Sequence, residues 1–395
     1  MKQNWQEKKV NLGNAIILST IALIVGGIIG ANFTTLKNQF GPYLGTQKLA
    51  PALDWQSLDR VYEELSSRYD GSIDQSKLIE GAKKGLVEAV KDDYTAYMDA
   101  STAKKFQESL HGKVGAGVGI EMAMREKYVR VVRTLPNNPA RKAGILAGDI
   151  IYKVDDKEVW NQKVDTIASK IRGKAGTKVK LTVIRNGNPQ DFELTREEIN
   201  NVSADISYDG QTAIIMVTRF DSDTGTIIQN FAKDFQSKGI KKVILDLRGN
   251  GGGYVSAAKD LLSLWLDGDK ILIQKSKSQG ENTIYANRGQ AILKDMKTIV
   301  LVNGTSASAS EIVTGALKDY KKATIVGEKT FGKGVVQTMV DLDAGSLLKV
   351  TTAHWYTPNG TTINHSGITP DQKVVRSYDD INSGHDPQMD AAKNL

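Results

Sequence analysis

Residues 297–317 read KTIVLVNGTSASASEIVTGAL: a short apolar run, a turn rich in hydroxyl groups, and an amphipathic stretch. The run is typical of a buried strand, and the stretch has the apolar spacing of a helix. Residues 241–253, KKVILDLRGNGGG, repeat the strand and the turn, and a helical pattern follows them. Strands and helices that alternate in this way predict an α/β domain whose sheet is covered on both faces. We expect this domain at residues 199–378, followed by a C-terminal tail at 379–395.

The composition limits the chemistry. The 395 residues include 52 Lys and Arg, 45 Asp and Glu, and no Cys. This length predicts two or three domains, and the positive charges form no basic block, so nucleic acid is not an expected partner. The absence of Cys rules out thiol catalysis, Cys-based zinc sites and disulfides. Any nucleophile must therefore be Ser, Thr, Lys or a carboxylate.

Residues 1–35 contain a long uncharged stretch. The 27 residues after Lys9 carry no charge, and their centre reads AIILSTIALIVGGIIGA. From Leu12 to Phe33 they supply the roughly 20 apolar residues that cross a hydrocarbon core. We therefore expect a short stub followed by one transmembrane helix.

The charges beside this stretch predict its orientation. Lys2, Lys8 and Lys9 precede it, and positive flanks stay in the cytoplasm. The stretch also ends in small residues, as a cleaved signal peptide does. Both alternatives place the rest of the chain outside the cytoplasm, at the cell membrane if the helix is an anchor and secreted if it is cleaved.

Residues 36–111 show apolar residues at helical spacing. Leu58, Val61 and Leu65 are examples. The pattern predicts a small helical region that serves packing or oligomerisation, so a second copy of the chain stays open as a partner.

A glycine turn and a helical stripe stand out in residues 112–198, among short strand-like runs. The turn consists of Gly117, Val118, Gly119 and Ile120, and the stripe of Val164, Ile167 and Ile171. The runs predict a small, mostly antiparallel barrel with one helix on it. Together with NPARKAGILAGDII at 138–151, the region resembles a PDZ domain of bacterial proteases.

The resemblance to a PDZ domain implies a peptide groove. Glycines let successive backbone N–H groups converge on a C-terminal carboxylate, and an exposed strand edge accepts the peptide as an added strand. The turn and the stripe are then the substrate-binding residues. Arg172, at the end of the stripe, is expected to be a solvated surface charge.

Two glycine-rich turns have spacings that argue against nucleotide binding. A G-x-G-x-x-G pattern begun at Gly249 meets Tyr254 where glycine is required. The segment GEKTFGKG at 327–334 has Gly334 where a P-loop needs Ser or Thr. Lys333 then needs another explanation, either as an exposed lysine or as one held in a confined apolar place.

The turn TSASASE at 305–311 has a structural and a chemical interpretation. Ser308 and Glu311 have the spacing of a capping box. A helix N-terminus also offers unpaired N–H groups where an oxyanion would form. A serine nucleophile needs a base, and none of the four histidines lies in a triad-like or zinc-binding segment. A lysine remains, with a pKa that burial must lower from about 10.4, although spacing alone pairs it with no particular serine.

Seven motifs follow one another from about residue 54 to the end: LIEGAKKGLVEAV, DDYTAYM, VGAGVGIEM, LDLRGNGGG, VLVNGTSASASEIVTGAL, VGEKTFGKGVVQ and YTPNGTTINHSGITPD. In this order they resemble the carboxyl-terminal processing peptidases, or tail-specific proteases, which are serine proteases with a PDZ domain and a Ser/Lys active site. The resemblance implies that Ser308 is the nucleophile, Lys333 the general base and Gln337 the assisting residue. It also implies an oxyanion hole formed by the N–H groups of Ala309 and Gly252, and it requires no metal or other cofactor.

The resemblance implies a membrane-anchored or exported serine endopeptidase. It would bind protein or peptide substrates by a free, apolar C-terminus and cleave them through an acyl-enzyme. The sequence departs from the family pattern at Asp93, where Pro is common, and at Thr361, where Arg is common. The alternative is an inactive PDZ scaffold at the cell surface, which would be expected to have lost Ser308 or Lys333.

Overall fold

The computed structural model describes residues 12–31, 54–110, 112–125 and 127–395 of the chain. It divides into two compact units, Met1–Leu78 and Ile79–Leu395, and each is described by itself.

The described part of the first unit is helical. It contains α1 (Leu12–Ala31), α3 (Trp55–Arg68) and the start of α4 (Gln75–Glu88). Asp54 caps α3, since its carboxylate accepts a hydrogen bond from Ser57 N–H at 3.3 Å. Neither α3 nor α4 contains a buried residue, so the apolar stripes predicted here are exposed.

The predicted transmembrane helix coincides with α1. Within the residues described, no helix combines the length and the apolar character that a membrane crossing requires. The structure therefore does not support the prediction. The prediction counted apolar residues as far as Phe33, and residues 32–53 lie outside the described part of the chain.

The second unit contains the predicted PDZ-like domain, built on a six-stranded sheet of order β3–β4–β5–β7–β8 with β6 paired to β5. Its elements are β3 (Ile120–Arg125), β4 (Tyr128–Thr134), β5 (Ile150–Val154), β6 (Lys157–Glu158), β7 (Lys178–Arg185), β8 (Asn188–Thr195), α6 (Pro139–Lys142) and α7 (Val164–Ile171). A separate antiparallel pair, β2 (Lys113–Gly117) and β9 (Glu197–Asn200), lies at the two ends of the domain in sequence. Helix α7 buries Ile167 and Ile171 in the domain's apolar core. The prediction of a mostly β domain with one main helix is confirmed.

The α/β domain is built on a six-stranded sheet of order β10–β11–β12–β15–β16–β19. The strands are β10 (Ala204–Asp209), β11 (Thr212–Val217), β12 (Lys242–Asp246), β15 (Lys297–Val302), β16 (Thr324–Gly327) and β19 (Gln372–Lys373). From β11 to β19 all neighbours run parallel, and β10 is an antiparallel edge strand. The sequence therefore predicted the class of this domain correctly.

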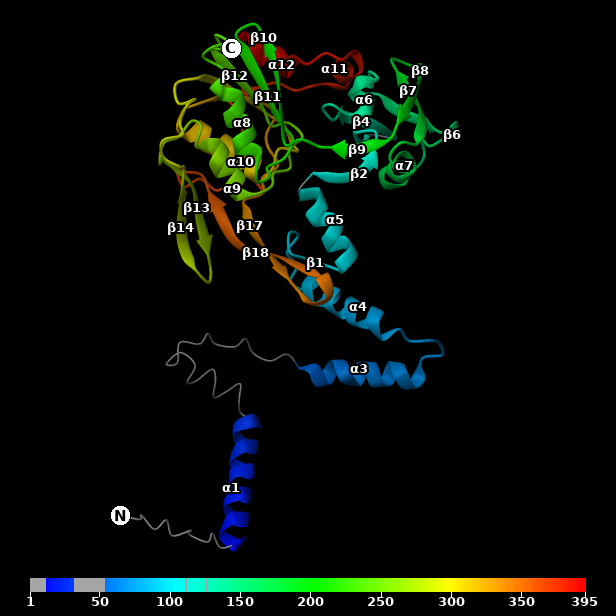
Figure 1. Ribbon diagram of the computed structural model, residues 1–395, viewed down its shortest axis with the longest axis vertical. Coiled ribbons are helices and arrows are strands. Elements are labelled where there is room, and N and C mark those ends of the chain that lie inside the picture. The colour runs from blue at the N-terminus through cyan, green and yellow to red at the C-terminus, as the bar shows by residue number, and fades with distance from the viewer. Residues whose placement is uncertain (1–11, 32–53, 111, 126) are drawn as a thin grey trace, which may run out of the picture. The chain divides into compact units, whose positions relative to one another are not determined.

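Helices cover both faces of this sheet (Figure 1). They are α8 (Thr224–Lys233), α9 (Val255–Leu262) and α10 (Ala309–Asp319) on one face and α12 (Pro387–Asn394) on the other. Successive strand residues point to opposite faces, so Val243 and Leu245 pack with the three helices while Ile244 packs with α12. The tail at 379–395 thus supplies one layer of the core.

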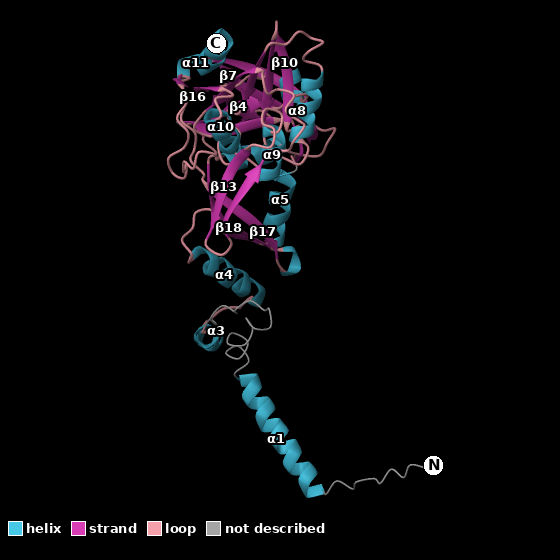
Figure 2. Cartoon of the chain, turned by 90° about the vertical axis from the view of Figure 1, so that its left-hand side faces the viewer, coloured by secondary structure: helices cyan, strands magenta, loops and turns pink. Residues whose placement is uncertain are grey.

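A second sheet, visible below the core in Figure 2, has the order β1–β18–β13–β14, with β17 also paired to β18. Its strands are β1 (Ala96–Met98), β13 (Lys270–Ser276), β14 (Gly280–Tyr285), β17 (Val335–Asp341) and β18 (Leu347–Tyr356). Helix α5 (Ala100–Leu110) and the short helix η2 (Asp343–Gly345) lie beside it. Helix α11 (Tyr378–Ser383) lies beside the PDZ-like domain instead, with Ile381 against Gly148 (Figure 1). The sequence predicts SLLKVTTAHWYTP as a strand of the α/β domain, but it forms β18 of this other sheet. An apolar strand pattern identifies a strand and does not identify its partners.

Candidate active site

Two turns meet beyond the ends of the neighbouring parallel strands β12 and β15. We call residues 247–253 the glycine turn and residues 303–308 the serine turn. Three hydrogen bonds join the two turns. Ser306 Oγ donates to Leu247 O at 2.8 Å, and Ala307 N donates to Asn250 O at 3.0 Å. Ser310 Oγ, in the first turn of α10, also donates to Asn250 O, at 2.9 Å. The two turns are therefore fixed to one another.

Ser308 has an unusual backbone at the start of α10, with φ 55° and ψ −114°. A positive φ is uncommon for a residue with a side chain, and such strain gathers at functional sites. Gly252, at φ 105°, lies against it, since a Cβ there would stand 2.8 Å from Ser308 Cβ. Only glycine permits this approach.

Glu311 connects the nucleophile candidate to the base candidate. Its fully buried carboxylate accepts hydrogen bonds from Ser308 N at 2.8 Å, Thr330 Oγ1 at 2.6 Å, Gly332 N at 2.7 Å and Lys333 N at 2.9 Å. Four donors on one carboxylate hold the start of α10 and the loop 330–333 at a fixed separation. The bond to Ser308 N–H is the half of the predicted capping box that Glu311 supplies.

Lys333 lies half-buried between β16 and β17. Its Nζ donates to Gln337 Oε1 at 2.7 Å and lies 5.3 Å from the centre of the Tyr94 ring. Burial lowers the pKa of Lys333, and the positive charge of Lys349 lowers it further, while the Glu311 carboxylate acts in the opposite direction. A lysine in this environment is closer to the neutral form that a base requires.

The structure thus brings Ser308, Lys333 and Gln337 into one region, with two differences from the expectation. No direct hydrogen bond between the Ser308 hydroxyl and Lys333 Nζ is found in the described part of the chain. Gly252 N–H donates to Asn250 Oδ1 at 2.9 Å, so in this conformation it is not available to an oxyanion. Ala309 is the first residue of α10, where the N–H has no partner within the helix.

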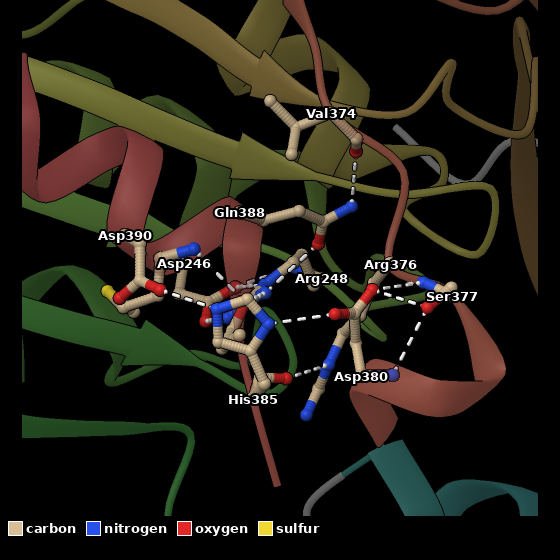
Figure 3. Close-up of polar contacts among 11 residues, drawn as sticks. Asp246, Arg248, Val374, Arg376, Ser377, Asp380, His385, Gln388 and Asp390 are labelled. Carbon is tan, nitrogen blue, oxygen red and sulfur yellow. Dashed lines mark hydrogen bonds and ion pairs between the residues drawn. The ribbon is translucent and has the colours of Figure 1, made fainter. Parts of the chain in front are cut away.

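Arg248 of the glycine turn is held by the C-terminal tail, which sequence analysis did not foresee. Its guanidinium binds both oxygens of Asp246 and donates to Gln388 Oε1 at 3.0 Å (Figure 3). It also donates to Asp386 Oδ1 at 2.8 Å. Gln388 donates in turn to Val374 O at 2.8 Å. The only sequence signal was the position of Arg248 beside the turn glycines, because the tail itself is polar.

A pocket of about 150 Å³ occupies the expected groove of the PDZ domain. It is lined by Ala116, Gly117, Val118, Gly119, Ile120, Glu121, Met122, Leu135, Ala168, Ile171, Arg172, Ile199 and Asn201. The lining includes the predicted turn Gly117–Ile120 and Ile171. Val164 is not among the lining residues, and Ile167 is fully buried in the core, so α7 turns Ala168 and Ile171 to the pocket instead. Arg172 is exposed, as expected, and also lines the pocket.

The site resembles no metal centre. In the part of the chain that the structure describes, no three His, Asp or Glu side chains are grouped to hold a metal ion. The described residues instead place a serine on a strained turn near a half-buried lysine, with a pocket on a separate domain. These features define a serine peptidase.

Comparison with known proteins gives the family. Residues 211–374 match Peptidase family S41, residues 116–195 match the PDZ domain, and residues 36–102 match the N-terminal domain of the activating protease CtpB. The "Probable CtpA-like serine protease" of Staphylococcus aureus strain N315 is 34% identical over 382 residues, covering 96% of this chain and 75% of the relative. The chain belongs to the CtpA-like serine proteases of peptidase family S41, as the motifs predicted.

Other relatives agree. The "Probable CtpA-like serine protease" of Staphylococcus saprophyticus is 35% identical over 331 residues, covering 83% of this chain and 67% of the relative. Among solved structures, the photosystem II D1 C-terminal processing protease matches with a TM-score of 0.56 and 29% identity, over 82% of this chain and 87% of that one. A putative S41 protease from Bacteroides fragilis shares the fold, with a TM-score of 0.59 and 16% identity.

Proposed function

We propose that this peptidase cleaves proteins with Ser308 as nucleophile and Lys333 as general base. The observation that carries the proposal is the shared contact of both residues with the Glu311 carboxylate. Neutral Lys333 takes the proton of Ser308 as Oγ attacks the scissile carbonyl carbon, and Ala309 N–H at the helix N-terminus faces the developing oxyanion. The C–N bond then breaks, and the leaving amine takes the proton from Lys333.

Deacylation uses the same groups. Lys333 removes a proton from water, the resulting hydroxide attacks the ester carbon, and Ser308 leaves with the proton to restore its hydroxyl. Gln337 Oε1 accepts from Lys333 Nζ in the resting state, which directs the amine. No cofactor takes part in any of these steps.

The pH dependence of kcat/KM tests the role of Lys333. Only its neutral form accepts a proton, so activity should rise with pH through the lysine's pKa in the folded protein. Burial lowers that pKa from the ordinary value. The increase in kcat/KM should therefore occur at a pH clearly below about 10.4, where free lysine titrates. The measurement is the rate of peptide cleavage across the pH range, and constant full activity down to pH 4 would exclude a lysine base.

We further propose that the PDZ domain selects substrates by a free C-terminal carboxylate with apolar side chains. The pocket supports this proposal, because the turn at residues 117–120 offers backbone N–H groups and the walls are largely apolar. Arg172 adds a positive charge at the edge of the pocket. Two substrates that differ only in amidation of the last residue test it. The acid should be cleaved faster, mainly through a lower KM, and equal kinetics would remove carboxylate recognition from the PDZ domain.

We also propose that the catalytic part works outside the cytoplasm, anchored in the membrane or released from it. The uncharged stretch after Lys9 and the lysines before it support export. Protease added to intact cells should degrade the bulk of the chain if it is anchored, and a secreted form should appear in the medium. A chain that stays intact inside such cells would contradict export.

A further inference from the structure

The segment 92–98, which precedes the PDZ domain, lies on the sheet that carries Gln337. Its strand β1 pairs with β18 in the register Ala96↔Lys349. Thr351 N–H of β18 donates to Thr95 Oγ1 at 3.1 Å, and Thr95 donates to Asp92 Oδ2 at 2.5 Å. The backbone around residue 94 is therefore held against β17 and β18.

Within this segment, Tyr94 makes two contacts with the candidate base and its assisting residue. Its carbonyl oxygen accepts a hydrogen bond from Gln337 Nε2, and its ring faces Lys333 Nζ at 5.3 Å. An amide has one donor end and one acceptor end. Because Nε2 is taken by Tyr94, Gln337 turns Oε1 to Lys333, which donates to it at 2.7 Å.

We propose that Tyr94 is a positioning residue for the general base: its carbonyl fixes the Gln337 amide, and its ring keeps water from the amine of Lys333. The proposal rests on the proposed function, in which Lys333 is the base. It also means that the peptidase site is completed by residues on both sides of the PDZ domain in sequence. Residue 94 lies within the match to the CtpB N-terminal domain and outside the match to family S41.

The charged groups around Lys333 determine in which direction its pKa shifts when Tyr94 is changed. The charges that act on Lys333 are Lys349 on β18, which lowers its pKa, and Glu311 on α10, which raises it. Asp92 raises the pKa of Lys349, whereas burial lowers it. The phenol of Tyr94 is kept neutral, since burial and nearby carboxylates raise its pKa.

Loss of the ring has two opposite consequences for Lys333. It removes an attraction between the ring and the ammonium, and it admits water to the amine. Burial is the largest cause of the lowered pKa, so hydration should dominate. We therefore expect the pKa of the base to rise when the ring is removed.

The test compares three variants of the full-length chain. Tyr94→Phe keeps the ring and the carbonyl, while Tyr94→Leu keeps the carbonyl and loses the ring. Tyr97→Leu is a matched control, because Tyr97 is on the same segment and also has a lysine, Lys83, 5.6 Å from its ring centre. Its hydroxyl binds Glu80 at 2.6 Å, and it has no contact with the base.

We expect Tyr94→Leu to lower kcat at neutral pH about tenfold, within the range of general-base effects, and to shift the rise of activity with pH upward by about half a unit or more. Tyr94→Phe should remain within about twofold of the parent and keep its pH profile. Tyr97→Leu should lower thermal stability and leave the pH profile unchanged. The proposal would be overturned if Tyr94→Leu kept the parent's pH profile and lost no more kcat than Tyr97→Leu does.

Lys333→Met, measured in parallel, separates this proposal from the proposed function. If Lys333→Met is inactive and Tyr94→Leu has the parent's profile, only the role of Tyr94 fails. If Lys333→Met still cleaves peptides, the base assignment fails, and the role of Tyr94 fails with it.

Discussion

Ser308→Ala and Lys333→Met are each expected to reduce peptide cleavage by about 10⁴-fold or more, as the loss of a nucleophile or its base does in other serine peptidases. The double variant should be little worse than either single variant, because the two groups act in one proton transfer. The measurement is kcat/KM on a peptide with a free, apolar C-terminus. Appreciable turnover by Ser308→Ala would exclude this nucleophile, and Ser306 and Ser310 would then be tested in turn.

Both variants should remain folded, and Lys333→Met should be at least as stable as the parent at neutral pH. Burial lowers the pKa of Lys333, so the unfolded chain binds its proton more tightly than the folded protein does. A group of this kind lowers the free energy of unfolding at any pH below its unfolded-state pKa. This destabilisation disappears as the pH rises through the unfolded-state pKa. Thermal unfolding at pH 7 checks the sign, and a large loss of stability in Lys333→Met would contradict it.

The sequence predicted those parts of the site that lie within one continuous segment. The strand, turn and helix around Ser308 are visible in VLVNGTSASASEIVTGAL, and so is the capping relation of Ser308 to Glu311. The bonds from Glu311 to loop 330–333 were not predictable, because they join segments about twenty residues apart. Spacing in the sequence does not show which loop will reach a buried carboxylate.

Other features were hidden because they depend on tertiary partners. The tail appears polar, yet α12 covers one face of the core sheet with small side chains such as Ala392, and it buries Gln388 against Arg248. Gly252 is a turn glycine, as expected, but the Asn250 side chain determines where its N–H points. Tyr94 lies in a family motif whose sequence does not show that it reaches the base.

Glu311→Gln should greatly reduce both activity and stability, although it changes few atoms. The carboxylate accepts four hydrogen bonds, whereas the amide offers one oxygen and sets an NH₂ group against backbone donors. Unpaired buried donors cost about 1–3 kcal/mol each, so losing two of them should lower the free energy of unfolding by about 2 kcal/mol or more. Asp319→Asn is the control on the same helix, since Asp319 accepts one bond, from Asn359 N at 2.8 Å.

The pH profile of Glu311→Gln distinguishes positioning from charge. The Glu311 carboxylate raises the pKa of Lys333, so its neutralisation should lower that pKa and leave more of the lysine neutral at pH 7. If Glu311 acted through charge alone, the variant would be as active as the parent or more so at that pH. We expect the opposite, a loss of about 100-fold in kcat, because misplacing reacting groups by about 1 Å can cost that much. A Glu311→Gln enzyme with normal kcat would show that the four hydrogen bonds are not needed to align Ser308 with Lys333.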